Sequence, residues 1–167
     1  VNVELSDGTV HEYAEGITAG EVIFNVHGKK SGAVAVLIDG EERDFSHIIE
    51  SDCKIKPISG DSDEGLYILR HSCAHLLAQA VVELFPDAKP TIGPPIDHGF
   101  YYDFHMDPIG DEDLRKIEKR MQQHIRSNHK IIREEYDNLT LREMFGSNKF
   151  KIEFAKGDKV KHSKFGQ

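Results

Sequence analysis

Residues 33–40 read Ala33-Val34-Ala35-Val36-Leu37-Ile38-Asp39-Gly40. Six apolar residues followed by a dipeptide typical of tight turns predict a strand that ends in a hairpin. The polar residues 41–44 are expected to pair back onto this strand. Because the apolar run is far shorter than the roughly 20 residues of a membrane span, it predicts a strand of a globular domain and no membrane partner.

The segments around this hairpin add further strands and a short helix. Thr18-Ala19-Gly20-Glu21 matches a capping box, which opens a helix through about Val26. The dipeptide Asp7-Gly8 is a second turn signal. The predicted strands of this part are residues 3–5, 10–13, 33–38, 41–44 and 53–58. This order of elements predicts a β-grasp, ubiquitin-like domain.

A polar cluster at residues 59–65 separates this part from the rest of the chain. We therefore divide the 167 residues into a domain 1–62 and a domain 63–167. The first carries five Lys and Arg against twelve Asp and Glu, and the second carries sixteen against seventeen, which gives a net charge of −8. This balance argues against a protein that holds nucleic acid by bulk charge alone.

The second domain is predicted to be α+β, with a long helix packed on an antiparallel sheet. The helix begins after Asp61 or Ser62 and ends near Phe85, where Pro86 stops it. Its predicted buried stripe is Leu66, Leu69, Cys73, Leu76, Ala80 and Leu84. Further predicted helices are residues 111–128 and 140–145, and the strands are residues 91–95, 99–105, 130–136 and 149–154. Helix 111–128 has Leu114, Ile117, Met121 and Ile125 on one face, with Arg115, Lys119 and Arg126 outside.

Two histidines, His71 and His75, lie four residues apart on the long helix, so both imidazoles point to one region. Such a pair suits a metal, a bound water or a ribose hydroxyl, and equally suits two half-buried rings bonded to carbonyl groups. A zincin-type protease is disfavoured because Ser72 stands where that chemistry needs a glutamate. No third metal ligand shows a suitable spacing to the pair, so we predict no metal site.

A glycine- and aromatic-rich segment follows the long helix. Gly93 and Gly99 allow close approach of the backbone, and the aromatic residues 100–104 either stack on a base or ribose or fill a core. The lysine-rich residues 149–164 are typical of a solvated face. The sequence contains no phosphate-binding loop of the G-x-x-x-x-G-K type, so it predicts no ATP site of that kind. With two cysteines there is no disulfide framework, which favours the cytoplasm.

Taken together, His71-Ser72-Cys73-Ala74-His75 and Gly99-Phe100-Tyr101-Tyr102-Asp103 resemble the threonyl-tRNA synthetase family. Residues 1–62 resemble its TGS domain, and residues 63–167 resemble the start of its second, editing domain, which would be incomplete. The resemblance implies a cytoplasmic parent enzyme that joins threonine to its tRNA. ATP, magnesium and zinc would belong to a class II catalytic core outside this chain. That core would also make the parent a homodimer, whereas we expect this fragment to be a monomer without cofactors.

The resemblance also implies an editing site for tRNA mischarged with serine. Serine lacks one methyl group of threonine, which is worth only ~1–3 kcal/mol of discrimination, so a second sieve is needed. His71 and His75 would contact the terminal ribose and place the attacking water. Tyr102 would line the pocket, with Gly99 and Phe100 beside it. Lys151 would stabilise the developing oxyanion.

One family element is absent from these residues. The family completes the site with Cys-x-x-x-His, whereas Cys53 is followed at the fourth position by Pro57 and Cys73 by Leu77. We therefore expect the fragment to be truncated and inactive or feeble as a hydrolase. Two alternatives remain open: a freestanding RNA- or protein-interaction module without catalysis, and a free-standing zinc-dependent editing factor, which predicts bound metal.

Overall fold

The computed structural model describes residues 1–28, 30–127, 131–134, 137–144, 146, 148 and 162–165. Within these ranges the fold is α+β, as predicted. The chain divides into two compact units, Val1–Leu69 and Arg70–Gln167, which we call unit 1 and unit 2. Among the described residues, we find no helix with both the length and the apolar character needed to cross a bilayer.

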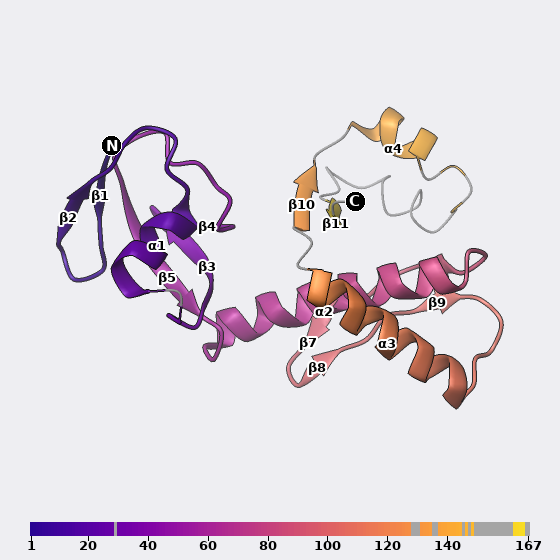
Figure 1. Ribbon diagram of the computed structural model, residues 1–167. Coiled ribbons are helices and arrows are strands. Elements are labelled where there is room, and N and C mark those ends of the chain that lie inside the picture. Colours follow the sequence, from indigo (N-terminus) through magenta and orange to yellow (C-terminus); the bar gives the residue numbers. More distant parts are fainter. Residues whose placement is uncertain are drawn as a thin grey trace. The chain divides into compact units, whose positions relative to one another are not determined.

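Unit 1 contains a five-stranded sheet with the strand order β2-β1-β5-β3-β4 (Figure 1). Strands β1 and β5, which come first and last along the chain, are parallel neighbours in the sheet. The other neighbouring strands are antiparallel. The strands are β1 (Asn2–Glu4), β2 (Val10–Glu12), β3 (Ala33–Ile38), β4 (Glu41–Arg43) and β5 (Cys53–Ser59). All five agree with the predicted positions to within two residues.

Helix α1 (Ala19–His27) begins at the predicted capping box. The Thr18 backbone N–H donates to the Glu21 carboxylate at 2.9 Å, and the Glu21 N–H donates to the Thr18 hydroxyl at 3.3 Å. Two N–H groups that the first helical turn leaves without helical partners are thereby satisfied. In the β3–β4 turn, Asp39 has φ 50° and Gly40 has φ 85°, the left-handed conformations that a tight hairpin requires.

The core of unit 1 lies between α1 and one face of the sheet. Val22 and Ile23 of α1 are fully buried against Val3, Val36 and Ile55, which come from three different strands. Each is a large apolar side chain, and full burial of one such chain is worth about 1.5–3 kcal/mol. Packing of α1 against β1, β3 and β5 therefore joins segments that lie far apart in the sequence.

Unit 2 is built on two helices. Helix α2 (Asp63–Leu84) begins within unit 1 and continues into unit 2, where it lies beside α3 (Asp111–Ser127) (Figure 1). Their common core consists of Ala80 and Val81 of α2, Ile117 of α3, and Ala88. Phe104 and Met121 pack against this cluster from its edge.

The predicted stripe of α2 is only partly correct. Leu76 and Ala80 are buried, but Leu69 and Leu84 are 40% and 36% exposed. Ala74 and Val81 are buried instead, and Val81 belongs with Ala80 to the cluster that α2 shares with α3. On α3, Ile117 is buried as predicted, whereas Leu114 and Ile125 at the ends of the predicted face are exposed.

The predicted strands 91–95 and 99–105 are wrong as continuous strands. The described residues there form two short antiparallel ladders, β6 (Lys89–Pro90) with β9 (Phe104–His105), and β7 (Pro95–Ile96) with β8 (Gly99–Phe100). Prolines at 90, 94 and 95 have no N–H to donate to a ladder, which explains the interruption. The predicted helix–sheet packing is therefore limited to contacts such as that of Phe104 with the α2–α3 core.

The remaining elements are short. Strand β10 (Ile131–Glu134) and helix α4 (Asn138–Met144) agree with the predicted strand and helix in that region. Strand β11 (His162–Phe165) pairs with β10 and was not predicted. The predicted strand 149–154 lies outside the described residues.

Candidate functional site

The two histidines of α2 form a direct pair. The Nε2 atoms of His71 and His75 are 2.9 Å apart, and the ring centroids are 4.6 Å apart with an interplanar angle of 75°. One Nε2 must carry a proton and the other must offer a lone pair, so one ring donates and the other accepts. The helical spacing of four residues thus brings both rings to one place, as predicted.

This hydrogen bond fixes the chemistry that the pair can perform. Across two neutral rings, the donor ring keeps a lone pair on Nδ1 and the acceptor ring carries its N–H there. If one ring takes up a proton, the resulting cation can donate to the neighbouring ring and is stabilised by it.

Tyr102 is held tightly within unit 2. Its half-buried ring stacks on Phe104, with centroids 4.9 Å apart and an interplanar angle of 26°. The ring also lies directly on Gly93, where an added Cβ would be 2.1 Å from the Tyr102 Cδ2 atom. Burial raises the pKa of Tyr102 above its ordinary value of 10. Its hydroxyl, which is already protonated at neutral pH, can donate a hydrogen bond there.

The backbone beside Gly93 explains this close approach. The Thr91 N–H donates to the Asp103 carbonyl at 2.9 Å, and the Asp103 N–H donates to the Ile92 carbonyl at 2.8 Å. These bonds bring the segment before Gly93 alongside the segment that carries Tyr102. The predicted close approach at Gly93 is therefore confirmed, and its partner is the Tyr102 ring.

The other predicted site residues have different positions. Gly99 and Phe100 lie on β8, where Gly99 pairs with Ile96 and Phe100 with Pro95. Both are half-buried, and a Cβ added at Gly99 would meet nothing within 4 Å. Lys151 lies outside the described residues.

A charged cluster joins α2 to α3 and was not predicted. One oxygen of Glu83, Oε2, lies 2.6 Å from Arg120 Nε and 2.8 Å from His124 Nε2. Its other oxygen, Oε1, accepts a hydrogen bond from Gln79 at 2.9 Å. Burial alone would raise the pKa of Glu83, but the hydrogen bonds from Gln79, Arg120 and His124 outweigh it, and the pKa lies below its ordinary value. The sequence signals for this cluster are two pairs of residues one turn apart, Gln79 with Glu83 on α2 and Arg120 with His124 on α3.

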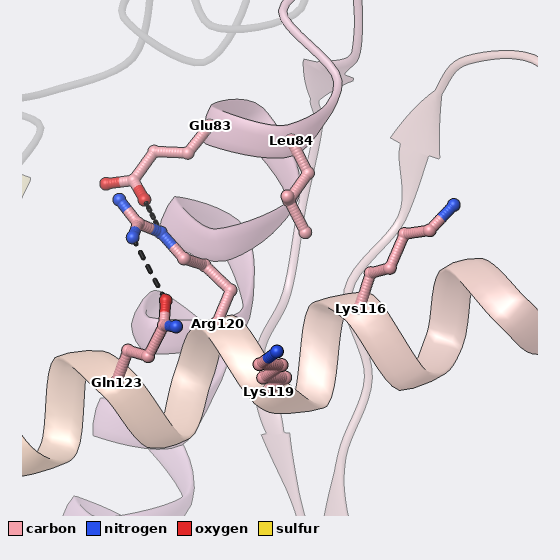
Figure 2. A pocket seen from close by; sticks show the side chains of 6 residues that line it. All are labelled: Glu83, Leu84, Lys116, Lys119, Arg120 and Gln123. Atoms are coloured by element: carbon pink, nitrogen blue, oxygen red, sulfur yellow. Dashed lines mark hydrogen bonds and ion pairs between the residues drawn. The ribbon is translucent and has the colours of Figure 1, made fainter.

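A surface depression of about 320 Å³ lies beside this cluster (Figure 2). In Figure 2 the Arg120 side chain points towards Glu83, while Lys116 extends away from that ion pair. Lys116 instead pairs with Glu112 at 3.4 Å and Asp113 at 3.1 Å. The residues that line the depression are Glu83, Leu84, Lys116, Lys119, Arg120 and Gln123.

The described part of the chain contains few side chains suited to bind a metal ion or to act as a nucleophilic thiol. There, no three or more His, Cys, Asp or Glu side chains gather in a way that could hold a metal ion. Cys53 and Cys73 are both free thiols. Burial, with smaller contributions from the carboxylates of Asp39 and Asp52, raises the pKa of Cys53, so this thiol is poorly suited to act as a nucleophile.

Comparison with known proteins gives a consistent result. No family model matches the chain. Relatives named threonine–tRNA ligase are 49% identical over 74% of the chain in Thermoplasma acidophilum, 44% identical over 87% in Thermobifida fusca, and 42% identical over 82% in Rickettsia typhi. The chain spans about a fifth of the length of these relatives, namely 19%, 22% and 22%. By its sequence the chain belongs to the threonine–tRNA ligase family, as a segment that corresponds to about a fifth of a member.

Proposed function

We propose that this chain is the TGS domain and the start of the editing domain of a threonyl-tRNA synthetase. In the parent enzyme it would bind the 3′ end of the threonine tRNA and remove serine attached by mistake. The observation that carries this proposal is the His71–His75 pair, whose Nε2 atoms are 2.9 Å apart. ATP, magnesium, zinc and the dimer contacts are assigned to the catalytic core of the parent, outside these 167 residues.

The topology of unit 1 supports its assignment as a β-grasp domain. The central strands β1 and β5 are parallel, the outer strands are antiparallel, and α1 packs across one face. This arrangement follows from the order of elements that the sequence predicts. The TGS role itself rests on the resemblance of residues 1–62 to that domain.

The histidine pair supports hydrolysis of an ester between an amino acid and a ribose. A neutral ring would take a proton from water as the water oxygen attacks the ester carbonyl. The carbon–oxygen bond to the ribose would then break, and the same proton would pass to the departing ribose oxygen. The products would be free serine and a tRNA with its ribose hydroxyl restored, so the rings would end as they began.

Tyr102 and Lys151 would act on the substrate beside the pair. The Tyr102 hydroxyl is protonated at neutral pH, burial raises its pKa further, and it would donate a hydrogen bond to the aminoacyl group. Lys151 would place a positive charge near the carbonyl oxygen, where negative charge develops during attack. Gly99 and Phe100 would form the adjacent wall of the cleft.

The test is release of radiolabelled serine from seryl-tRNA by the full-length parent enzyme. Replacing His71 or His75 with Ala is expected to slow this release by about 10²–10⁴-fold, the usual contribution of general acid–base catalysis. His27→Ala is the matched control, because His27 is an exposed histidine of unit 1 at the end of α1. If His71→Ala and His27→Ala release serine equally fast, the editing proposal is wrong.

A further inference from the structure

Three basic residues of α3 form a line along its outer surface. Arg115, Lys119 and Arg126 are all exposed. At about 100° per residue they lie within about 40° of one another around the helix axis, and over about 16 Å along it. The buried residue Ile117 lies on the opposite side of α3. We call Arg115, Lys119 and Arg126 the α3 stripe.

The stripe differs from Lys116 and Arg120 of the same helix in having no ion pair with any residue that the structure describes. Lys116 pairs with Glu112 and Asp113, and Arg120 pairs with Glu83. Among the residues that the structure describes, no carboxylate lies within 4.0 Å of the charged groups of the α3 stripe. Lys116 and Arg120 of α3 are therefore paired with carboxylates, whereas the three cations of the α3 stripe are not paired with any described residue.

The neighbouring acids could have compensated the stripe but do not. Glu118 follows Arg115 by three residues, yet its Oε1 accepts a hydrogen bond from Gln122 at 3.4 Å. Arg115 and Lys119 are themselves like charges one turn apart, an arrangement that slightly destabilises a helix. A line of uncompensated cations with this small cost is suited to a polyanion that supplies the missing negative charge.

We propose that the α3 stripe binds the phosphate backbone of RNA. The identity of the RNA as tRNA rests on the proposed function above. Charge complementarity favours RNA, because its phosphates form a row of negative charges and the three cations here lie in a row without an ion pair to any described residue. Lys119 also lines the depression in Figure 2, so a strand that follows the stripe would pass beside a concave surface.

The experiment compares two triple variants of this chain. Arg115→Gln/Lys119→Gln/Arg126→Gln removes the stripe, and Lys30→Gln/Lys54→Gln/Lys56→Gln removes three exposed lysines of unit 1 as the matched control. Both variants change the net charge from −8 to −11. The probe is a transcript of threonine tRNA that carries no amino acid, and its binding is measured by fluorescence anisotropy between about 50 and 200 mM salt.

Loss of the stripe is expected to weaken binding at least about tenfold at the lowest salt. It should also reduce the slope of log K against log salt by about 0.7–0.9 per lost phosphate contact, or about 2–3 in total. The control should keep the affinity within about twofold of the wild type and keep its slope. Thermal melting followed by circular dichroism verifies that both variants fold, since all six positions are exposed.

Equal affinity and slope for the two variants would overturn the proposal, as would a wild-type chain that shows no salt-dependent RNA binding. Failure of the editing proposal is recognised separately, because it is measured as serine release by the His71→Ala variant of the parent enzyme, whereas the RNA surface is tested by the salt slope of the stripe variant. A stripe-dependent slope in this chain, together with a parent enzyme whose His71→Ala and His27→Ala variants release serine equally fast, would support the RNA surface and reject the editing site.

Discussion

Gly93→Ala tests how the Tyr102 ring is held. The new Cβ would lie 2.1 Å from Tyr102 Cδ2 and 2.6 Å from both Cε2 and Cγ, whereas ordinary contacts are 3.4–4 Å. The ring must therefore retreat by more than about 1 Å. It cannot do so freely, because it stacks on Phe104, which packs against the α2–α3 core. Overpacking of this kind costs about 1–3 kcal/mol.

The assay is urea unfolding of the chain followed by circular dichroism. The backbone at Gly93 does not have a positive φ, so the expected loss of stability comes from the collision with the ring. Gly99→Ala is the control in the neighbouring ladder, because a Cβ there meets nothing within 4 Å, and its stability should stay within about 0.5 kcal/mol of the wild type.

A variant that lacks the Tyr102 ring tests whether contact with this ring causes the loss of stability. In a Tyr102→Ala chain the obstacle is gone, so adding Gly93→Ala should cost little, and the difference between the two backgrounds should approach the full 1–3 kcal/mol estimated above. The reasoning is refuted if Gly93→Ala costs less than about 0.5 kcal/mol in the wild type, or if it costs the same with and without the Tyr102 ring.

Three further predictions use the same unfolding measurement. Thr18→Ala removes the capping box of α1 and should cost about 0.5–2 kcal/mol, and a Thr18→Ser variant that loses as much would contradict it. Gly65→Ala would place a Cβ 1.9 Å from the Ser59 carbonyl oxygen, so we expect about 3 kcal/mol or more, because backbone yields less readily than a side chain. Since the pKa of Glu83 is lowered from its ordinary 4.5, its stabilisation is present above that pH and is lost as pH falls. Glu83→Gln should therefore be less stable than the wild type at pH 7, the gap should narrow as the pH is lowered below 4.5, and a gap independent of pH would disprove this.

Local signals in the sequence predicted much of unit 1. The capping box of α1 and the Asp39-Gly40 turn act within four residues, so the sequence shows them directly. Strand β3 was recognisable because six apolar residues end at that turn. These features need no knowledge of what packs against them, and for this reason their bounds were predicted closely.

Unit 2 was predicted less well because its contacts are not local. Leu69 and Leu84 fit a helical stripe as well as Ala80 does, but only the position of α3 decides which of them is covered. The sequence marked Gly93 and Tyr102 separately, without indicating that they touch. The approach of Glu83 to Arg120, 37 residues later, left no pattern that could be read in advance.

Pairing of the first strand with the last has a consequence for synthesis on the ribosome. Val3 pairs with Cys53, so β1 has no native neighbour on that side until about fifty more residues have been made. At about 5–20 residues per second, this wait lasts roughly 3–10 s. During it the β1 edge of the β1–β2 hairpin is unpaired, and such an edge is a surface that other chains can join. The nascent segment is thus most open to misassembly in the seconds before β5 is complete.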